Sequence, residues 1–302
     1  MALNTTQLWA PVEPVVRKFF GLGEKSIKKV YSQTHKVSKG QEAVRHAVQM
    51  GGPGQLVKKT EGGNVSSLNI KQGTNKTWLY DVYAGRIELT FELARDNKVR
   101  EINKAASTLG RSVALTPEYQ VGLFWDRAYN SSYPQVADGT NELCATDHVI
   151  IGTSATTGSN MLSTVAALSE TSLQDVYTNL LSTPGADGMI VQTMPEKLLV
   201  PAALALTGKK LTLAGKTLGS ANNDPKVVGD DLTLVVNPYL TDTNNWFVIT
   251  DHPDGLWFEF DIESDFMEDT VMTNLNKAYI AISRFRFGVD NWRAVYGSGA
   301  VS

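Results

Sequence analysis

The pattern of apolar and polar positions is weak over the first 75 residues. Residues 21–76 contain glycine or another turn former every few positions, and helical periodicity is sustained only over residues 41–50. Residues 65–70 and 77–83 alternate like two strands, with residues 71–76 (KQGTNK) as the turn between them. An isolated hairpin is only marginally stable in water. We therefore expect an extended arm followed by a long two-stranded flap that lies on a partner surface.

A strand that leads into a long amphipathic helix comes next. Residues 85–93 (GRIELTFEL) place their apolar side chains at every second position, as a strand with one buried face does. In residues 94–115 the apolar positions recur at spacings of three and four, which predicts a long helix with one apolar stripe. Thr116 and Pro117 predict a boundary, with Pro117 at the first position of a second helix.

The rest of the chain reads as short strands and helices in mixed order. We predict a helix over residues 173–181 with Ser172 as its N-cap, and a helix that opens at 201–206. Short strands are predicted in four places, at residues 189–192, 197–200, 232–236 and 246–250. A strand at 257–261, a polar acidic connection and a strong strand at 278–289 complete the chain. This order predicts an α+β protein.

Composition adds few constraints. The chain has 302 residues, of which 42% are hydrophobic and 20% charged, an ordinary globular balance. A single cysteine, Cys144, excludes a disulfide framework. The longest apolar run, residues 198–206, is far too short to span a bilayer. The opening residues, MALNTTQLWAPVEP, lack the basic start and apolar core of a secretion signal, so we expect a cytosolic chain.

The net charge of −3 hides a division along the sequence. Residues 17–59 carry ten basic and two acidic side chains, whereas residues 224–270 carry twelve acidic side chains and one basic. Segments of opposite sign can meet inside one subunit or between copies, or they can form two solvated faces. The basic positions are spaced singly and lack interleaved aromatic residues, so no sequence-specific reading of nucleic acid is predicted.

Residues at two places in the chain have side chains that are typical of chemical sites. Cys144, Asp147 and His148 contain a nucleophile and a base, but neighbours in sequence seldom face each other, and a partly buried free thiol is the better interpretation. Residues 251–255 (DHPDG) are typical of a turn and not of a metal-ligand set. We predict no catalytic, cofactor-binding or metal site.

Five segments, in order along the chain, resemble the major capsid proteins of tailed bacteriophages with the Hong Kong 97-type fold, in particular the Mu-like major head subunit branch. They are YDVYAGRIELTFELARDN (80–97), DGTNELCATDHVIIGTSATTGSNML (138–162), ADGMIVQTMPEKLLVPAAL (186–204), LVVNPYLTDTNNWFVITD (234–251) and FRFGVDNWRAVYGSG (285–299). Together they extend over about 220 residues.

The resemblance implies an architecture and a structural function that involves no enzymatic reaction. The expected divisions are an N-terminal arm (1–45), an extended loop or flap (46–84), a P-domain with a long spine helix (85–140 and 263–302) and an A-domain (141–262). Many copies would form pentamers and hexamers of an icosahedral shell around packaged double-stranded DNA, which the protein would contact non-specifically. Scaffolding, portal and decoration proteins are further expected partners, and assembly would take place in the host cytoplasm. The alternative within the same fold is an encapsulin-type nanocompartment shell that encloses an enzyme.

Contacts between subunits are predicted from charge and from aromatic residues of the flap. We expect basic residues of the arm and flap to meet acidic residues of adjacent subunits, and aromatic residues at the base of the flap to pack on a neighbour or within the hairpin itself. These predicted contact residues are Arg17, Lys18, Lys58, Lys59, Trp78, Tyr80, Asp261, Glu263 and Asp265. Some members of the family form a Lys–Asn crosslink, for which Lys58, Lys59, Lys71 and Lys76 could offer the amine. No crosslink is predicted here.

Overall fold

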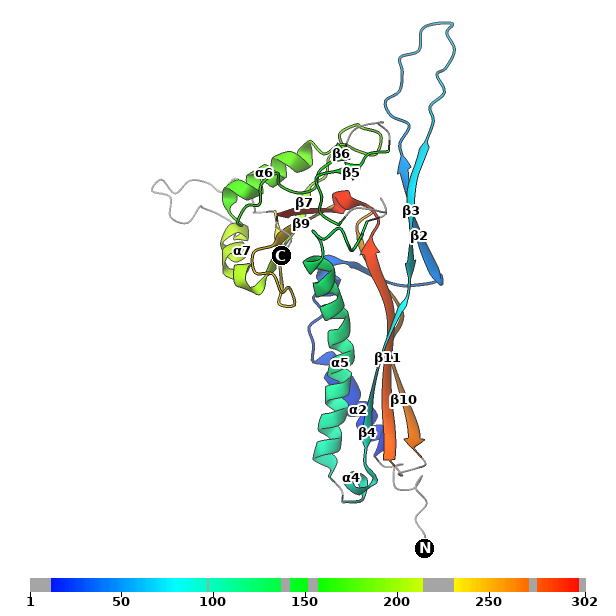
Figure 1. Ribbon diagram of the computed structural model, residues 1–302, viewed down its shortest axis with the longest axis vertical. Coiled ribbons are helices and arrows are strands. Elements are labelled where there is room, and N and C mark those ends of the chain that lie inside the picture. Colours follow the sequence, from blue (N-terminus) through cyan, green and yellow to red (C-terminus); the bar gives the residue numbers. More distant parts are fainter. Residues whose placement is uncertain are drawn as a thin grey trace, which may run out of the picture.

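The computed structural model describes residues 12–96, 98–136, 142–151, 157–213, 231–271 and 276–298. These residues form an elongated body from which a two-stranded hairpin projects along the long axis (Figure 1). One half of the body contains a sheet covered by two helices, and the other half contains a second sheet with shorter helices.

The first sheet has four strands in the order β1-β10-β11-β4. Its members are β1 (Lys36–Lys39), β10 (Leu256–Val271), β11 (Asn276–Val289) and β4 (Asp81–Leu89). β10 and β4 pair antiparallel with β11, and β1 pairs parallel with β10. The prediction of an acidic connection after Asp261 is wrong, because β10 continues through it to Val271. The long partner strand β11 supplies hydrogen bonds over that length, and two register shifts between Phe260 and Asp265 accommodate the irregular sequence.

Two helices cover this sheet: α2 (Glu13–Lys25) and α5 (Val99–Asp126). The described part of the arm, predicted to be extended, therefore includes a helix, and residues 1–11 lie outside the described residues. Val16 and Phe20 of α2 are buried in one cluster with Ile102 of α5 and Tyr279 of β11. The apolar residues of α2 gather on one face, and the packing of that face stabilises this short helix.

α5 runs without interruption through Pro117, so the predicted boundary between two helices is wrong. Proline inside a helix costs about 3 kcal/mol. The turns beyond it bury Val121, Phe124 and Trp125 in the largest core cluster, and each buried side chain of this kind contributes about 1.5–3 kcal/mol. Packing therefore outweighs the local preference to end the helix.

The second sheet has the order β12-β9-β7-β8. Its members are β12 (Val295–Ser298), β9 (Trp246–Thr250), β7 (Pro195–Pro201) and β8 (Thr233–Asn237). The strands predicted at 197–200, 232–236 and 246–250 are thus confirmed. The one predicted at 189–192 is reduced to an isolated bridge between Ile190 and Pro184.

Helices complete this half of the body. The predicted helix opening after Pro201 is confirmed as a 3-10 turn, Ala202–Leu204, followed by α7 (Ala205–Thr212). α6 (Glu170–Leu181) begins one turn earlier than predicted, because Ser169 is its N-cap. Ser172 is the third helical residue and completes a capping box with Ser169.

One continuous core joins the two halves. It combines Trp125 of α5, Phe258 of β10, Phe247 of β9 and Trp292 of the short 3-10 helix Trp292–Ala294. β10 begins within the segment that the sequence assigned to the A-domain, and β12 lies in the segment assigned to the P-domain. The chain therefore passes between the halves at both places. The remaining small elements are α3 (Tyr31–Thr34), α4 (Phe91–Arg95), β5 (His148–Val149) and β6 (Thr157–Gly158).

The projecting hairpin consists of β2 (Val44–Gly51) and β3 (Lys71–Leu79). The predicted flap exists, but its strands lie elsewhere: residues 41–50 are largely strand and not helix, and residues 71–76 are strand and not turn. Backbone pairing with β3 decides the conformation of β2, whose apolar spacing alone fits a helix. The connection between the strands is the 19-residue segment 52–70.

Candidate functional site

The end of the hairpin exposes apolar side chains far from the core. We call residues 50–70 the hairpin tip. Five of its apolar side chains are at least 65% exposed: Met50, Leu56, Val57, Val65 and Ile70. The tip extends beyond the rest of the body (Figure 1), so the described part of the subunit does not cover it. A group of exposed apolar residues of this kind is typical of a surface that another molecule covers.

The base of the hairpin is fixed to the first sheet by a buried ionic network. The Arg286 side chain, 3% exposed, binds Glu259 through Nε at 2.8 Å and donates to the carbonyl oxygens of Trp78 and Glu42, both at 3.1 Å. Arg45 of β2 binds the other carboxylate oxygen of Glu259 at 2.5 Å. One carboxylate thus joins two guanidinium groups, and the network connects both strands of the hairpin to β10 and β11.

The sequence analysis missed Arg286 and Glu259, although a signal was present. Each charged residue stands between two phenylalanines, in FEF (258–260) and FRF (285–287), and the two are register partners in neighbouring strands. A charge at a buried strand position requires a partner of opposite sign, since an unpaired buried charge is costly.

The two predicted aromatic contact residues pack within the subunit. The Trp78 ring lies perpendicular to Trp257, with 5.5 Å between ring centres, and the Tyr80 ring lies 4.1 Å from the Arg286 guanidinium carbon. A Cβ at Gly288 would approach Trp78 to 2.8 Å, so this glycine provides the space for the ring. Both side chains are half-buried. Contact of their exposed edges with a neighbour stays a prediction.

The predicted acidic residues lie along β10. Asp261 pairs with Arg284 at 2.9 Å, and Glu263 pairs with Lys29 of the basic segment. Asp265 is half-buried and forms no ion pair with any residue that the structure describes. Opposite charges from the two ends of the chain therefore meet, in part, inside one subunit.

The predicted basic contact residues are more exposed to solvent than the predicted acidic ones. Arg17 lies over the ring of Phe266, 5.4 Å from its centre. Lys18 on α2 and Lys58 and Lys59 in the hairpin tip are exposed. Among the described residues none of these three lysines forms an ion pair.

A buried carboxylate on α5 holds the segment that follows α2. Glu118 is 1% exposed and accepts hydrogen bonds from the backbone N–H groups of Val30 at 2.6 Å and Tyr31 at 3.3 Å. Burial raises the pKa of Glu118 to about 7, against the opposing effect of these two hydrogen bonds. We therefore expect the docking of this segment to depend on pH near neutrality. Glu118 was also missed from sequence.

The structure describes contacts of His148 with Trp292 and Asn160. The His148 ring stacks on Trp292 at 4.7 Å, and its Nε2 lies 3.0 Å from Oδ1 of Asn160. Asn160 also accepts from the Ala145 N–H. Burial raises the pKa of the Cys144 thiol, which is the opposite of the shift that a nucleophilic cysteine needs.

Residues 251–255 also have a structural role. The Asp254 N–H donates to Nδ1 of His252 within the predicted turn, and Asp251 accepts from the Met194 N–H. No group of three or more histidine, cysteine, aspartate or glutamate side chains that could hold a metal ion occurs within the described ranges. A search of the same ranges for a helix with the length and hydropathy of a membrane span finds none.

Comparison with known proteins gives one family. The family model described as phage capsid protein matches residues 81–298. No curated protein matches the chain.

Several solved structures share its fold. The chain is similar to the structure titled Mycobacterium phage Patience (TM-score 0.58, 12% identity), with 99% of this chain and 89% of that chain covered. It is also similar to the procapsid of bacteriophage JBD30 (TM-score 0.53, 12% identity, 97% and 75% covered). A third structure is a virus-like particle from Pyrococcus furiosus (TM-score 0.52, 9% identity, 94% and 97% covered).

Proposed function

Because the chain belongs to the phage capsid protein family, we propose that its copies form pentamers and hexamers that close into an icosahedral shell around packaged double-stranded DNA. The chain is a major capsid protein with the Hong Kong 97-type fold, and as such it belongs to the virion. Its placement in the Mu-like branch stays a prediction. A structural role needs no reaction, and we propose no enzymatic activity.

The observation that carries the assembly proposal is the projecting hairpin. Its apolar tip is exposed in the single subunit, whereas its base is held by the Arg286–Glu259–Arg45 network. A rigid base with an uncovered apolar tip suits an arm that lies on a neighbouring subunit. Interfaces of obligate assemblies commonly bury more than about 2,000 Å² in total, which an arm of this length helps to supply.

We propose the division into an arm (1–45), an extended loop (46–84), a P-domain (85–140 and 263–302) and an A-domain (141–262). The second sheet supports the A-domain assignment, although β10 crosses the boundary at residue 262 and β12 joins this sheet from the segment assigned to the P-domain. Scaffolding, portal and decoration proteins are proposed partners, and assembly in the host cytoplasm is proposed as well.

We further propose that Lys58 and Lys59 contact acidic residues of an adjacent subunit in the range 251–269, with Arg17 and Lys18 making similar contacts from the arm. The exposure of the three lysines supports this, because their charges are available to a neighbour. The variant Lys58→Glu/Lys59→Glu should assemble only at higher protein concentration than the wild type. The matched control is Lys209→Glu/Lys210→Glu, an adjacent pair on α7. Unchanged shell yield and stability in the hairpin variant would contradict the contact.

The first experiment is to express the chain alone and measure particle mass by sedimentation, with negative-stain images of the same sample. Closed shells or megadalton rings are expected. If the chain sediments as a monomer of about 33 kDa even when it is co-expressed with candidate scaffolding proteins, the assembly proposal is wrong.

The similarity to the virus-like particle from Pyrococcus furiosus favours one alternative for what the shell encloses. In that alternative the shell is an encapsulin-type compartment that encloses an enzyme in place of DNA. Particles purified from infected cells and treated with nuclease separate the two proposals. Protected genome-length DNA supports the phage head, and a single co-purified enzyme without DNA supports the compartment.

A further inference from the structure

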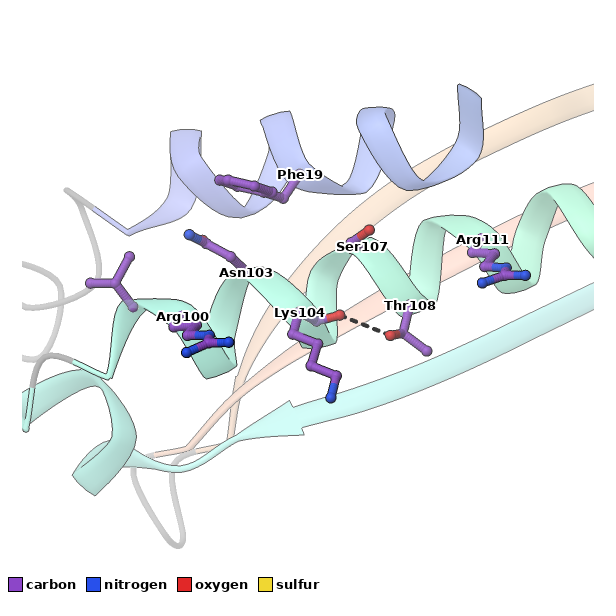
Figure 2. Close-up of a pocket in the computed structure, with 8 residues that line it drawn as sticks. Phe19, Arg100, Asn103, Lys104, Ser107, Thr108 and Arg111 are labelled. Atoms are coloured by element: carbon purple, nitrogen blue, oxygen red, sulfur yellow. Dashed lines mark hydrogen bonds between the residues drawn. The ribbon is translucent and has the colours of Figure 1, made fainter. Parts of the chain in front are cut away.

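A groove of about 710 Å³ lies between α2 and the first half of α5 (Figure 2). Phe19 of α2 and Val99 of α5 provide its apolar surface, and Val99 is 43% exposed. Asn103, Ser107 and Thr108 add an amide and two hydroxyl groups. The groove therefore combines apolar and polar surface outside the hairpin contacts proposed above.

The shape of this groove is fixed by close packing of the two helices. A Cβ at Gly23 would lie 2.1 Å from the carbonyl oxygen of Ser107, and a Cβ at Gly110 would lie 2.1 Å from that of Phe20. The two backbones are thus in contact, and only glycine allows it. Because the helices cannot approach further, the groove cannot close on itself.

One flank of the groove is cationic. Arg100, Lys104 and Arg111 line it from α5, at relative positions 0, 4 and 11, which lie on one side of a helix. All three are exposed, and none forms an ion pair with any residue in the described ranges. No acidic residue lines the groove, and Glu101, the nearest in sequence, is not part of its wall.

We propose that this groove binds an amphipathic helix of a partner protein, with its apolar stripe on Phe19 and Val99 and acidic residues facing Arg100, Lys104 and Arg111. A helix that lies along α5 advances by the same 1.5 Å per residue. The three cations are therefore matched by carboxylates separated by four and seven residues on the partner. A groove with apolar surface and one charged flank is the usual arrangement for recognition of such a helix.

Duplex DNA matches only part of the groove. Its phosphates would satisfy the three cations, but they would leave the apolar surface of Phe19 and Val99 uncovered. A helix with an apolar stripe uses both features. The proposal goes beyond the capsid role, because it assigns a partner to a surface that the hairpin contacts do not use.

The test uses the full-length chain and a fluorescein-labelled helical peptide of about 20 residues. The peptide carries a leucine stripe flanked by glutamates separated by four and seven residues. Its control is a peptide of the same composition in scrambled order, and a random-sequence duplex of similar length is the nucleic-acid probe. Binding is measured by fluorescence anisotropy for the wild type, for Arg100→Glu/Lys104→Glu/Arg111→Glu and for the charge-matched control Lys25→Glu/Lys28→Glu/Lys36→Glu, whose lysines are exposed and do not line the groove. Circular dichroism and sedimentation of the same samples report folding and assembly.

The expected result is that the ordered peptide binds the wild type and that the groove variant weakens binding at least tenfold, while the control variant changes it less than twofold. Equal binding of the scrambled peptide, absence of binding, or equal loss in the control variant would overturn the proposal. Selective loss of DNA binding in the groove variant, with the peptide unaffected, would identify a nucleic-acid surface instead. Val99→Ser removes the apolar contact without changing the charge and should weaken peptide binding severalfold. Loss of peptide binding with unchanged assembly separates this inference from the proposed shell.

Discussion

The hairpin tip offers the sharpest test of assembly, through the variant Leu56→Ser/Val65→Ser. Both side chains are 80% exposed in the single subunit. Complete burial of a leucine or valine side chain contributes about 1.5–3 kcal/mol, so covering the exposed part of both would contribute about 2–5 kcal/mol per subunit. This corresponds to a factor of about 30 to several thousand in the association constant. The folded subunit should lose almost nothing, since exposed substitutions change its stability by about 0.5 kcal/mol or less.

Sedimentation velocity over a concentration series measures this effect as the protein concentration at which particles first form. The threshold should rise at least about 30-fold for the serine variant. The thermal midpoint of the unassembled variant should match that of the wild type. Leu56→Met/Val65→Ile keeps the apolar surface and should assemble as the wild type does. If the serine variant assembles at the wild-type threshold, the tip stays exposed in the particle and does not stabilise it.

Three further predictions concern the subunit itself. Arg286→Ala should lower the free energy of unfolding by about 3–5 kcal/mol in denaturant titrations, because it removes one partner of a buried ion pair. The control Arg86→Ala, at an exposed ion pair, should change this free energy by about 1 kcal/mol or less. Equal losses of unfolding free energy in the two variants would contradict the role of the network. Burial raises the pKa of Glu118 from 4.5 to about 7, so the contribution of Glu118 to stability is complete below pH 4.5 and is lost as the pH rises through 7. Between pH 5 and 8 the thermal midpoint of Glu118→Gln should therefore fall less than that of the wild type. Parallel curves of thermal midpoint against pH for the two proteins would exclude the effect. Burial also raises the pKa of the Cys144 thiol. Alkylation of Cys144 by iodoacetamide at pH 8 should therefore be at least about 100-fold slower in the folded than in the unfolded chain. Comparable alkylation rates would show that the thiol is accessible in the folded chain.

Several elements could be predicted because their patterns are local and strong. The strand at Trp246–Thr250 is entirely apolar and buried, and it was predicted with the correct ends. The helix after Val99 follows from its apolar spacing, and the helix after Pro201 from the position of proline. Cys144 was predicted as a partly buried free thiol, and the structure buries this free thiol almost completely.

The predictions for other elements were wrong where strand pairing or packing decides the conformation. β2 has spacing that fits a helix, yet it is a strand because β3 lies beside it. The acidic part of β10 has no apolar alternation to reveal a strand, but β11 pairs with it to Val271. Glu118 and Arg286 look like ordinary surface charges in the sequence, and only the folded chain shows that they are buried with partners.

Four features follow from the sequence alone: the α+β class, the order of the main elements, the presence of a flap and the separation of basic and acidic residues along the chain. These features depend on periodicity and composition, which each segment carries alone. The tertiary structure decided where the hairpin strands begin, that α5 continues past Pro117, and which charges meet inside the subunit, such as Lys29 with Glu263. These outcomes depend on contacts between residues far apart in the chain, whose free energies exceed local preferences of about 1 kcal/mol per residue and of about 3 kcal/mol at Pro117.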